Sequence, residues 1–107
     1  MPSMTTIDTQ PPYPLPHRLD VRNSAAVGKA ISELIEGSPQ SLILDARDLA
    51  YISSKGVHTL RRLRICLQAA GGALTVVGPR PFVREVLTYG GLGDILQPME
   101  GERPTGR

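Results

Sequence analysis

Two adjacent serines, Ser53 and Ser54, stand where the sequence predicts the start of a helix. The first turn of a helix exposes unpaired N–H groups and the positive end of the helix dipole, so a phosphate placed there is stabilised. Lys55 and Gly56 follow the serines, and Asp20 is a second polar residue expected just after a strand. In open α/β sheets, functional groups gather in the loops beyond the carboxyl ends of the strands. These residues are therefore candidates for a modification or binding site.

The same serines also have a purely structural explanation. Serine is among the preferred N-cap residues, because its hydroxyl accepts a hydrogen bond from the first turn of the helix. On the residue types alone, this capping role is the favoured one. The two roles are compatible, since a capping hydroxyl can also be modified.

Other reactive side chains lack the partners that catalysis or metal binding requires. His17 and His58 have no neighbours at metal-ligand spacing, and the sequence has no Ser-His-Asp order and no glycine-rich phosphate loop. The single cysteine, Cys66, excludes an internal disulfide, and its place between Ile65 and Leu67 predicts a buried structural thiol. The sequence therefore predicts no catalytic residue, no metal and no cofactor.

Composition places the chain among small globular proteins. Its 107 residues suffice for one domain, and 40% apolar and 21% charged residues are an ordinary balance. A net charge of +2 does not require a polyanionic partner, and 4% aromatic residues without Trp leave few stacking faces for nucleic acid. The N-terminus has no basic region followed by an apolar stretch, and no apolar run is long enough to span a bilayer. We therefore expect a cytoplasmic protein.

The chain is expected to consist of a proline-rich N-terminal segment, one domain and a polar tail. Five prolines make residues 1–16 unsuitable for a central strand, although a short edge strand around residues 13–19 fits the pattern. No internal repeat or linker divides residues 17–100, which are expected to form one domain. The tail, residues 101–107, is polar and expected to be flexible.

The first clear helix begins near Asn23 or Ser24, either of which suits the N-cap, and ends at Gly37. Lys29 and Glu33 are spaced to pair on its solvent side. Its apolar positions recur at helical spacing; they are Val27, Ala30, Ile31, Leu34 and Ile35.

Two short aliphatic segments, residues 41–45 and 73–77, have the pattern of strands buried on both faces. Between them, a loop through Tyr51 and Ile52 leads to a helix that begins at the two serines and ends at Gly71. Its inward face carries Val57, Leu60, Leu63 and Leu67, and its outer face carries Arg61, Arg62 and Arg64. The arginines suit a partner surface or a phosphate track, but a solvated helix face is the favoured explanation.

A third helix is expected to begin at Pro81, which is tolerated in a first turn, and to end at Gly90. Its apolar stripe is Phe82, Val83, Val86 and Leu87. Residues 95–99 suit a last short strand. Helices that alternate with buried strands predict an α/β fold. We expect a small, largely parallel sheet of four to five strands, packed with three or four helices and joined by right-handed crossovers.

Residues 42–57, LILDARDLAYISSKGV, resemble the signature of STAS domains in anti-sigma factor antagonists. That signature is an aliphatic strand ending in Asp, a loop with an aromatic-Ile pair, and Asp-Ser-Ser-Gly-Leu at the start of a helix. Three more segments resemble the family: residues 18–20 (RLD), 71–79 (GGALTVVGP) and 89–96 (YGGLGDIL). Four segments in the right order and at the right spacing are fairly specific.

The resemblance implies a phosphorylation-controlled switch and not an enzyme. In that family, a kinase of the histidine-kinase-like ATPase fold, often itself the anti-sigma factor, phosphorylates a serine at the helix N-terminus. A metal-dependent serine phosphatase of the PP2C type reverses the modification. Ser54 matches the phosphorylated serine, with Ser53 as the alternative, and Asp20 matches an aspartate close to it. The implied partner surface consists of Asp20, Ser53, Ser54, Lys55, Gly56 and Val57.

Three features depart from the family pattern. Ser53 occupies a position that is commonly Asp, and Lys55 replaces a small residue. A solvated surface lysine is the favoured explanation of Lys55, although it could also contact the kinase. The usual N-terminal strand pair is shortened and rich in proline, which bears on the first edge of the sheet and on any partner contact made there.

Two other functions remain open at this point. A STAS domain can also serve as an accessory subunit of a membrane transporter or as a scaffold in a sensory complex, because fold does not fix function. A nucleic-acid binder would use the arginines of the second helix, but the low net charge and scarce aromatic residues count against it.

Overall fold

Four short parallel strands form the main sheet of the computed structural model, which describes residues 12–37 and 41–97. The strand order is β1-β3-β5-β6, with bounds Tyr13–Pro14 (β1), Ser41–Asp45 (β3), Ala73–Val77 (β5) and Leu96–Gln97 (β6). A separate parallel pair consists of β2 (Arg18–Leu19) and β4 (Tyr51–Ile52). The α/β class and the parallel sheet predicted from the sequence are confirmed.

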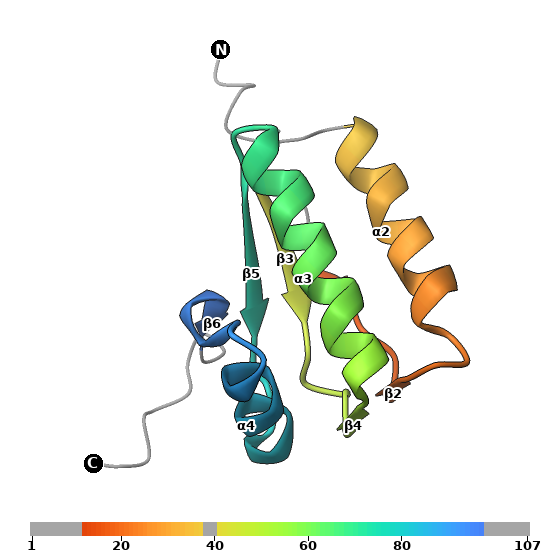
Figure 1. Ribbon diagram of the computed structural model, residues 1–107, viewed down its shortest axis with the longest axis vertical. Coiled ribbons are helices and arrows are strands. Elements are labelled where there is room, and N and C mark those ends of the chain that lie inside the picture. Colours follow the sequence, from red (N-terminus) through yellow and green to blue (C-terminus); the bar gives the residue numbers. More distant parts are fainter. Residues whose placement is uncertain (1–11, 38–40, 98–107) are drawn as a thin grey trace.

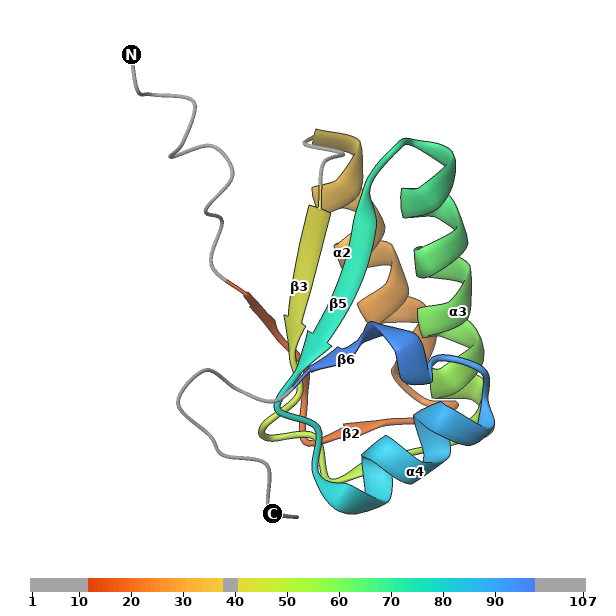
Figure 2. The ribbon, with the colours of Figure 1, turned by 90° about the vertical axis from the view of Figure 1, so that its left-hand side faces the viewer.

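Three α-helices connect these strands: α2 (Ser24–Gly37), α3 (Ser54–Ala69) and α4 (Pro81–Tyr89). A short 3₁₀ turn, Gly93–Ile95, precedes β6. Helices α2 and α3 lie side by side over one face of the sheet (Figures 1 and 2). Both begin at the end of the molecule where β3 and β5 finish, and α4 lies at this same end (Figure 1). The helix starts and the strand ends therefore gather on one side.

The strands of the main sheet are buried on one face only. Leu42, Leu44 and Val76 point into the core, whereas Ile43 is 38% exposed. The prediction of strands buried on both faces is therefore wrong. The reason is visible in Figure 2, where α2 and α3 cover the same face and no described helix covers the other.

The apolar stripe of α3 is confirmed, because its four predicted inward residues are all buried: Val57, Leu60, Leu63 and Leu67. The stripes of the other helices are narrower than predicted, since Leu34 is 40% and Phe82 50% exposed. Cys66 is exposed, so the prediction of a buried thiol is wrong. It lies beside the buried stripe, on the flank of α3 that faces α2.

The N-terminal segment forms two short strands, β1 and β2, and not the single edge strand predicted around residues 13–19. β1 occupies the edge of the main sheet beside β3, which fits its proline, and β2 leaves to pair with β4. Tyr51 and Ile52 thus form a strand where a loop was predicted. At the other end, β6 covers Leu96–Gln97 of the predicted 95–99, and residues 98–99 and the tail 101–107 lie outside the described residues.

Candidate functional site

The two-stranded sheet brings the predicted site residues together. Leu19 pairs with Ile52 at the ends of β2 and β4, so Asp20 and Ser53 leave two neighbouring strands at the same edge. The backbone N–H of Ser53 donates to the carbonyl oxygen of Leu19 at 3.0 Å. The start of α3 is therefore tied to the residue that precedes Asp20.

The two serines have different roles at the start of α3. Ser53 is the N-cap residue, with an extended backbone, and its Oγ accepts a hydrogen bond of 3.3 Å from the N–H of Gly56. Ser54 is the first residue of the helix and is exposed. Its hydroxyl makes no hydrogen bond to any residue within 12–37 or 41–97. The capping role thus falls on Ser53 and leaves the Ser54 hydroxyl accessible to solvent.

Gly56 permits a close approach between α3 and the small sheet. A Cβ atom at this position would lie 2.6 Å from the Leu19 carbonyl oxygen and 2.7 Å from Ile52 Cγ1, well inside van der Waals contact. Gly56 and Val57 are both buried, so they lie beneath the exposed Ser54 and Lys55. Glycine at this position fixes how near the serines stand to Asp20.

Asp20 is held in a tight turn just before α2. Its carboxylate accepts hydrogen bonds from Arg18 Nε at 2.9 Å and from the Arg22 backbone N–H at 3.0 Å. The Arg18 guanidinium first, and then the Arg22 N–H, hold the pKa of the Asp20 carboxyl below its usual value of 3.8. The side chain of Asn23 binds the Asp20 N–H and the Arg18 carbonyl oxygen, so it stabilises this turn. Asp20 is therefore a fixed carboxylate at neutral pH.

A groove of about 640 Å³, here called the α3–α4 groove, runs beside the exposed serine. Ser54 and Lys55 line it from the start of α3, and Val86 and Tyr89 line it from α4. Tyr89 is 92% exposed, and with the half-buried Val86 it leaves apolar surface uncovered next to the serine. Exposed apolar patches with a polar rim are typical of protein-binding surfaces.

A stack of three side chains extends this surface along the same stripe of α4, because Phe82 precedes Val86 and Tyr89 at helical spacing. The rings of Tyr51 and Phe82 are stacked at 6.2 Å between centroids and 13° between planes. The Arg18 guanidinium carbon lies 5.1 Å from the centre of the Tyr51 ring. Tyr and Arg are frequent at the centres of protein interfaces. Sequence reasoning missed this stack, because its members come from β2, β4 and α4; the only sequence signal was an aromatic residue next to Ile52.

The model of the STAS domain family matches residues 2–103. The chain belongs to the STAS domain family. No match to a curated protein was found.

Solved structures share the fold of this STAS domain. The anti-sigma factor antagonist SpoIIAA, in its unphosphorylated form, is 28% identical, with a TM-score of 0.71 over 82% of this chain and 77% of SpoIIAA. A putative anti-sigma factor antagonist from Thermotoga maritima is 22% identical, with a TM-score of 0.68 over 78% of this chain and 74% of that protein. The murine anion transporter Slc26a9 is 18% identical, with a TM-score of 0.62 over 75% of this chain but only 14% of the transporter.

The arginines of α3 in this STAS domain do not form one surface. Arg61 donates to the carbonyl oxygen of Gly90, and Arg64 binds both carboxylate oxygens of Asp94, so these two arginines connect α3 to the C-terminal elements. Arg62 alone lines the space between α2 and α3. The arrangement does not present a continuous phosphate track.

Other features of the described residues bear on cofactors and membranes. Across 12–37 and 41–97, no group of three His, Cys, Asp or Glu side chains is placed to hold a metal ion. In the same part of the chain, no helix is long and apolar enough to cross a bilayer.

The predicted pairing of Lys29 with Glu33 is not seen, since the ion pairs among the described residues are those of Arg18, Arg47 and Arg64.

Proposed function

We propose that this STAS domain is an anti-sigma factor antagonist, a phosphorylation-controlled protein-binding switch and not an enzyme. The observation that carries this function is the division of roles between the serines. Ser53 caps α3, while the Ser54 hydroxyl is exposed and makes no hydrogen bond to a described residue. Modification of Ser54 therefore leaves the helix cap intact. The 28% identity to the antagonist SpoIIAA supports a role of this kind.

In the unphosphorylated state, the partner surface around Asp20, Ser53, Ser54 and Lys55 binds an anti-sigma factor in the cytoplasm. This factor is also a serine kinase of the histidine-kinase-like ATPase fold. Phosphorylation of Ser54 adds about −1.5 to −2 charges in the middle of the contact. Burying that phosphate against a partner surface that offers no matching cation costs several kcal/mol, which ends binding. A PP2C-type phosphatase restores the binding form.

The exposed phosphate is compatible with the fold, so the switch needs no refolding. A phosphate on Ser54 stands at the N-terminus of α3, where the helix dipole and the free N–H groups favour an anion. The nearby Asp20 carboxylate is paired with Arg18, which limits its repulsion of the phosphate. We therefore attribute the loss of binding to charge and bulk at the surface.

The first test is mass spectrometry of the protein isolated from its own host, with and without treatment by a PP2C-type phosphatase. We expect one phosphatase-sensitive phosphate, which fragment spectra assign to Ser54. Ser53→Ala is the matched control and should keep the phosphate, whereas Ser54→Ala should lose it. Absence of the phosphate under several growth conditions would contradict the switch.

The second test measures partner binding directly. Ser54→Asp should bind the kinase weakly, and Ser54→Ala should bind it persistently, because only the first variant carries charge at the contact. Equal binding of both variants and the wild type would show that Ser54 does not control the interaction.

The fold shared with the transporter Slc26a9 favours one alternative function. In that case the chain is an accessory subunit of a transporter, or a scaffold of a sensory complex, without a phosphorylation cycle. Recovery of transporter subunits in place of a kinase, together with unmodified Ser54, would decide for this function.

A further inference from the structure

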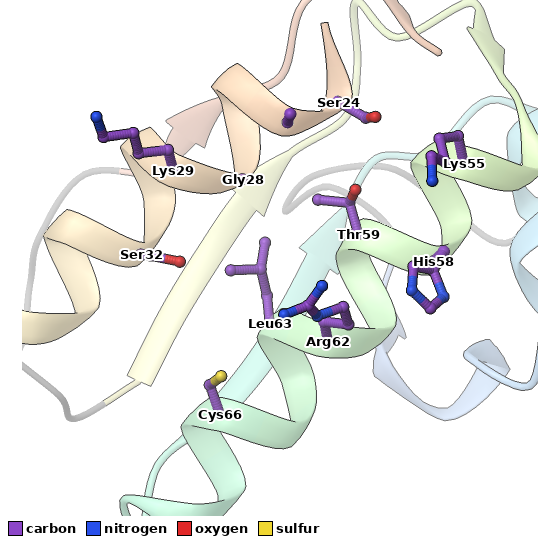
Figure 3. Close-up of a pocket in the computed structure, with 11 residues that line it drawn as sticks. Ser24, Gly28, Lys29, Ser32, Lys55, His58, Thr59, Arg62, Leu63 and Cys66 are labelled. Carbon is purple, nitrogen blue, oxygen red and sulfur yellow. The ribbon is translucent and has the colours of Figure 1, made fainter. Parts of the chain in front are cut away.

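A second groove, here called the α2–α3 groove, runs between the two long helices and has a volume of about 370 Å³. Figure 3 shows the side chains that line it. The helices approach closely at one point, where a Cβ atom on Gly28 would lie 3.0 Å from Thr59 Cγ2. On the α3 side the groove is lined by Lys55, His58 and Arg62.

The charged side chains that line the α2–α3 groove, Lys29, Lys55 and Arg62, are all cations. Lys55, His58 and Arg62 follow each other at helical spacing, so they form one stripe along α3. Lys29 lies at the opposite rim on α2, with its ammonium group directed away from α3 in Figure 3. No carboxylate lines the groove. None of these four side chains forms a hydrogen bond or an ion pair with a residue that the structure describes.

The cations are spread along the groove and do not converge on one point. Lys55 and Arg62 are seven residues apart, which corresponds to about 10 Å along a helix. An extended peptide covers this distance with about three residues. Several carboxylates on one short segment therefore match the stripe better than a single compact anion does. Hydroxyl groups of Ser32 and Thr59 add hydrogen-bonding capacity between the cations.

We propose that the α2–α3 groove binds a short acidic segment of a protein partner. This inference deepens the proposed function, because Lys55 and His58 line both the α2–α3 groove and the α3–α4 groove beside Ser54. One partner thus contacts the Ser54 surface and places its acidic segment along α3. A phosphate on Ser54 stands next to Lys55 and competes with this segment for the lysine.

Nucleic acid is the less suitable occupant of the α2–α3 groove. Single strands bind to proteins through aromatic faces as well as cations, and the lining contains no Phe, Tyr or Trp. The exposed rings of Tyr51 and Phe82 come from β4 and α4, and neither ring lines this groove. A protein carboxylate needs only the cations and hydroxyls that are present.

The test uses fluorescein-labelled hexaglutamate as the probe and the intact protein, with fluorescence anisotropy at low salt. Lys55→Gln and Arg62→Gln should each raise the Kd about three-fold, and the double variant about ten-fold, as expected for exposed ion pairs. Lys29→Gln should have a smaller effect, because its ammonium group is directed away from α3. Arg84→Gln, which removes the same charge from α4 outside both grooves, is the matched control and should leave the Kd nearly unchanged.

Amide chemical shifts locate the probe independently of these variants. Hexaglutamate should shift the amides of residues 24–32 and 55–66 and leave those of β5 unmoved. Equal weakening by Arg62→Gln and Arg84→Gln would overturn the inference, because binding would then follow net charge alone. Equal displacement of the probe by inorganic phosphate and by unlabelled hexaglutamate at matched ionic strength, or tighter binding of a DNA oligonucleotide, would also overturn it. The probe needs no phosphorylation, so this result stands apart from the Ser54 tests.

Discussion

On the side that faces β2, the start of α3 is held by backbone contacts, whereas on the side that faces α4 and the 3₁₀ turn the helix is held further along by the side chains of Arg61 and Arg64. The first side has the hydrogen bond from Ser53 to Leu19 and no room for a Cβ atom at Gly56. The second side has the bond from Arg61 to the Gly90 carbonyl oxygen and an open groove. The second side is also close at one point, because a Cβ atom on Gly90 would lie 2.6 Å from Val57 Cγ1, but the contact there is a side chain and not backbone. Ser54 therefore stands between a side packed on backbone and a more adaptable side with the groove. We infer that the packed side positions the serine and the open side accommodates the partner.

The largest expected effect is on the packed side. Gly56→Ala should lower the free energy of unfolding by about 2 kcal/mol, because the new methyl group meets the Leu19 carbonyl oxygen and cannot be relieved by a side-chain rotation. Equilibrium unfolding in urea measures the loss. Gly93→Ala is the matched control, since its Cβ atom would lie 3.4 Å from the nearest atoms. Equal stability of the two variants would mean that the close approach is absent.

The next effect separates the two serines. Ser53→Ala should cost about 1 kcal/mol, the usual value for loss of a serine N-cap. Ser54→Ala should change the free energy of unfolding by less than about 0.5 kcal/mol, as is usual for an exposed site. Thermal and urea unfolding of both variants measure this difference. A larger loss for Ser54→Ala would reverse the assignment of cap and exposed hydroxyl.

The sequence was sufficient for the features that depend on local periodicity. The buried stripe of α3 follows from a 3.6-residue repeat, and Pro81 and Gly90 mark the ends of α4 because their backbone preferences are local. Which of the two adjacent residues caps α3 could not be predicted, since both are serines and serine suits an N-cap. That choice depends on where β4 ends, and β4 exists only through its pairing with β2.

Features that depend on packing between distant segments could not be predicted either. Ile43 is exposed because α2 and α3 cover the same face of the sheet. The residue types of β3 do not indicate whether helices cover one face of the sheet or both. Cys66 has apolar neighbours in sequence but lies one position before the buried Leu67, on the flank of the helix. The stack of Tyr51 and Phe82 joins two elements that are far apart in the chain.

A third, smaller effect tests whether the exposed serine tolerates negative charge. Ser54→Asp should raise the free energy of unfolding by about 0.5 kcal/mol, because a carboxylate in the first turn interacts favourably with the helix dipole. The gain should shrink at high salt, which screens exposed charges. Unfolding experiments at two salt concentrations provide the measurement. A destabilised Ser54→Asp variant would contradict our view that phosphorylation acts without disturbing the fold.

A fourth effect concerns the adaptable side of α3. Arg64→Gln removes the ion pair with Asp94 and should lower the melting temperature by less than Ser53→Ala does, because exposed ion pairs contribute little. The same variant should make the amides of residues 93–95 exchange faster with solvent, since Arg64 holds this turn against α3. Hydrogen exchange measures this local change. Unchanged exchange would show that packing of the buried Leu92 and Ile95 suffices to hold the turn.

The last effect is a pH dependence on the packed side. The bonds from Arg18 and Arg22 lower the pKa of Asp20 in the folded protein, so its ionised form stabilises the fold above the usual value of 3.8. This contribution is lost as the pH falls below 3.8 and through the folded pKa. Arg47 and Arg64 lower the pKa of Asp45 and Asp94 in the same way.

Asp20→Asn isolates the contribution of Asp20 from those of the other two carboxylates. The variant should be less stable than the wild type at pH 6, and the difference should shrink as the pH falls, because only the wild type loses a charged hydrogen-bond acceptor. Asp45→Asn provides the matched comparison, since Asp45 is paired with Arg47 at the end of β3, in the main sheet and not in the β2–β4 pair. Both variants should show this convergence in urea unfolding from pH 6 to pH 3, but only Asp20→Asn should also shift the amides of Ser53 and Ser54. If Asp45→Asn shifted those amides equally, the coupling between Asp20 and the start of α3 would not be specific to the β2–β4 pairing.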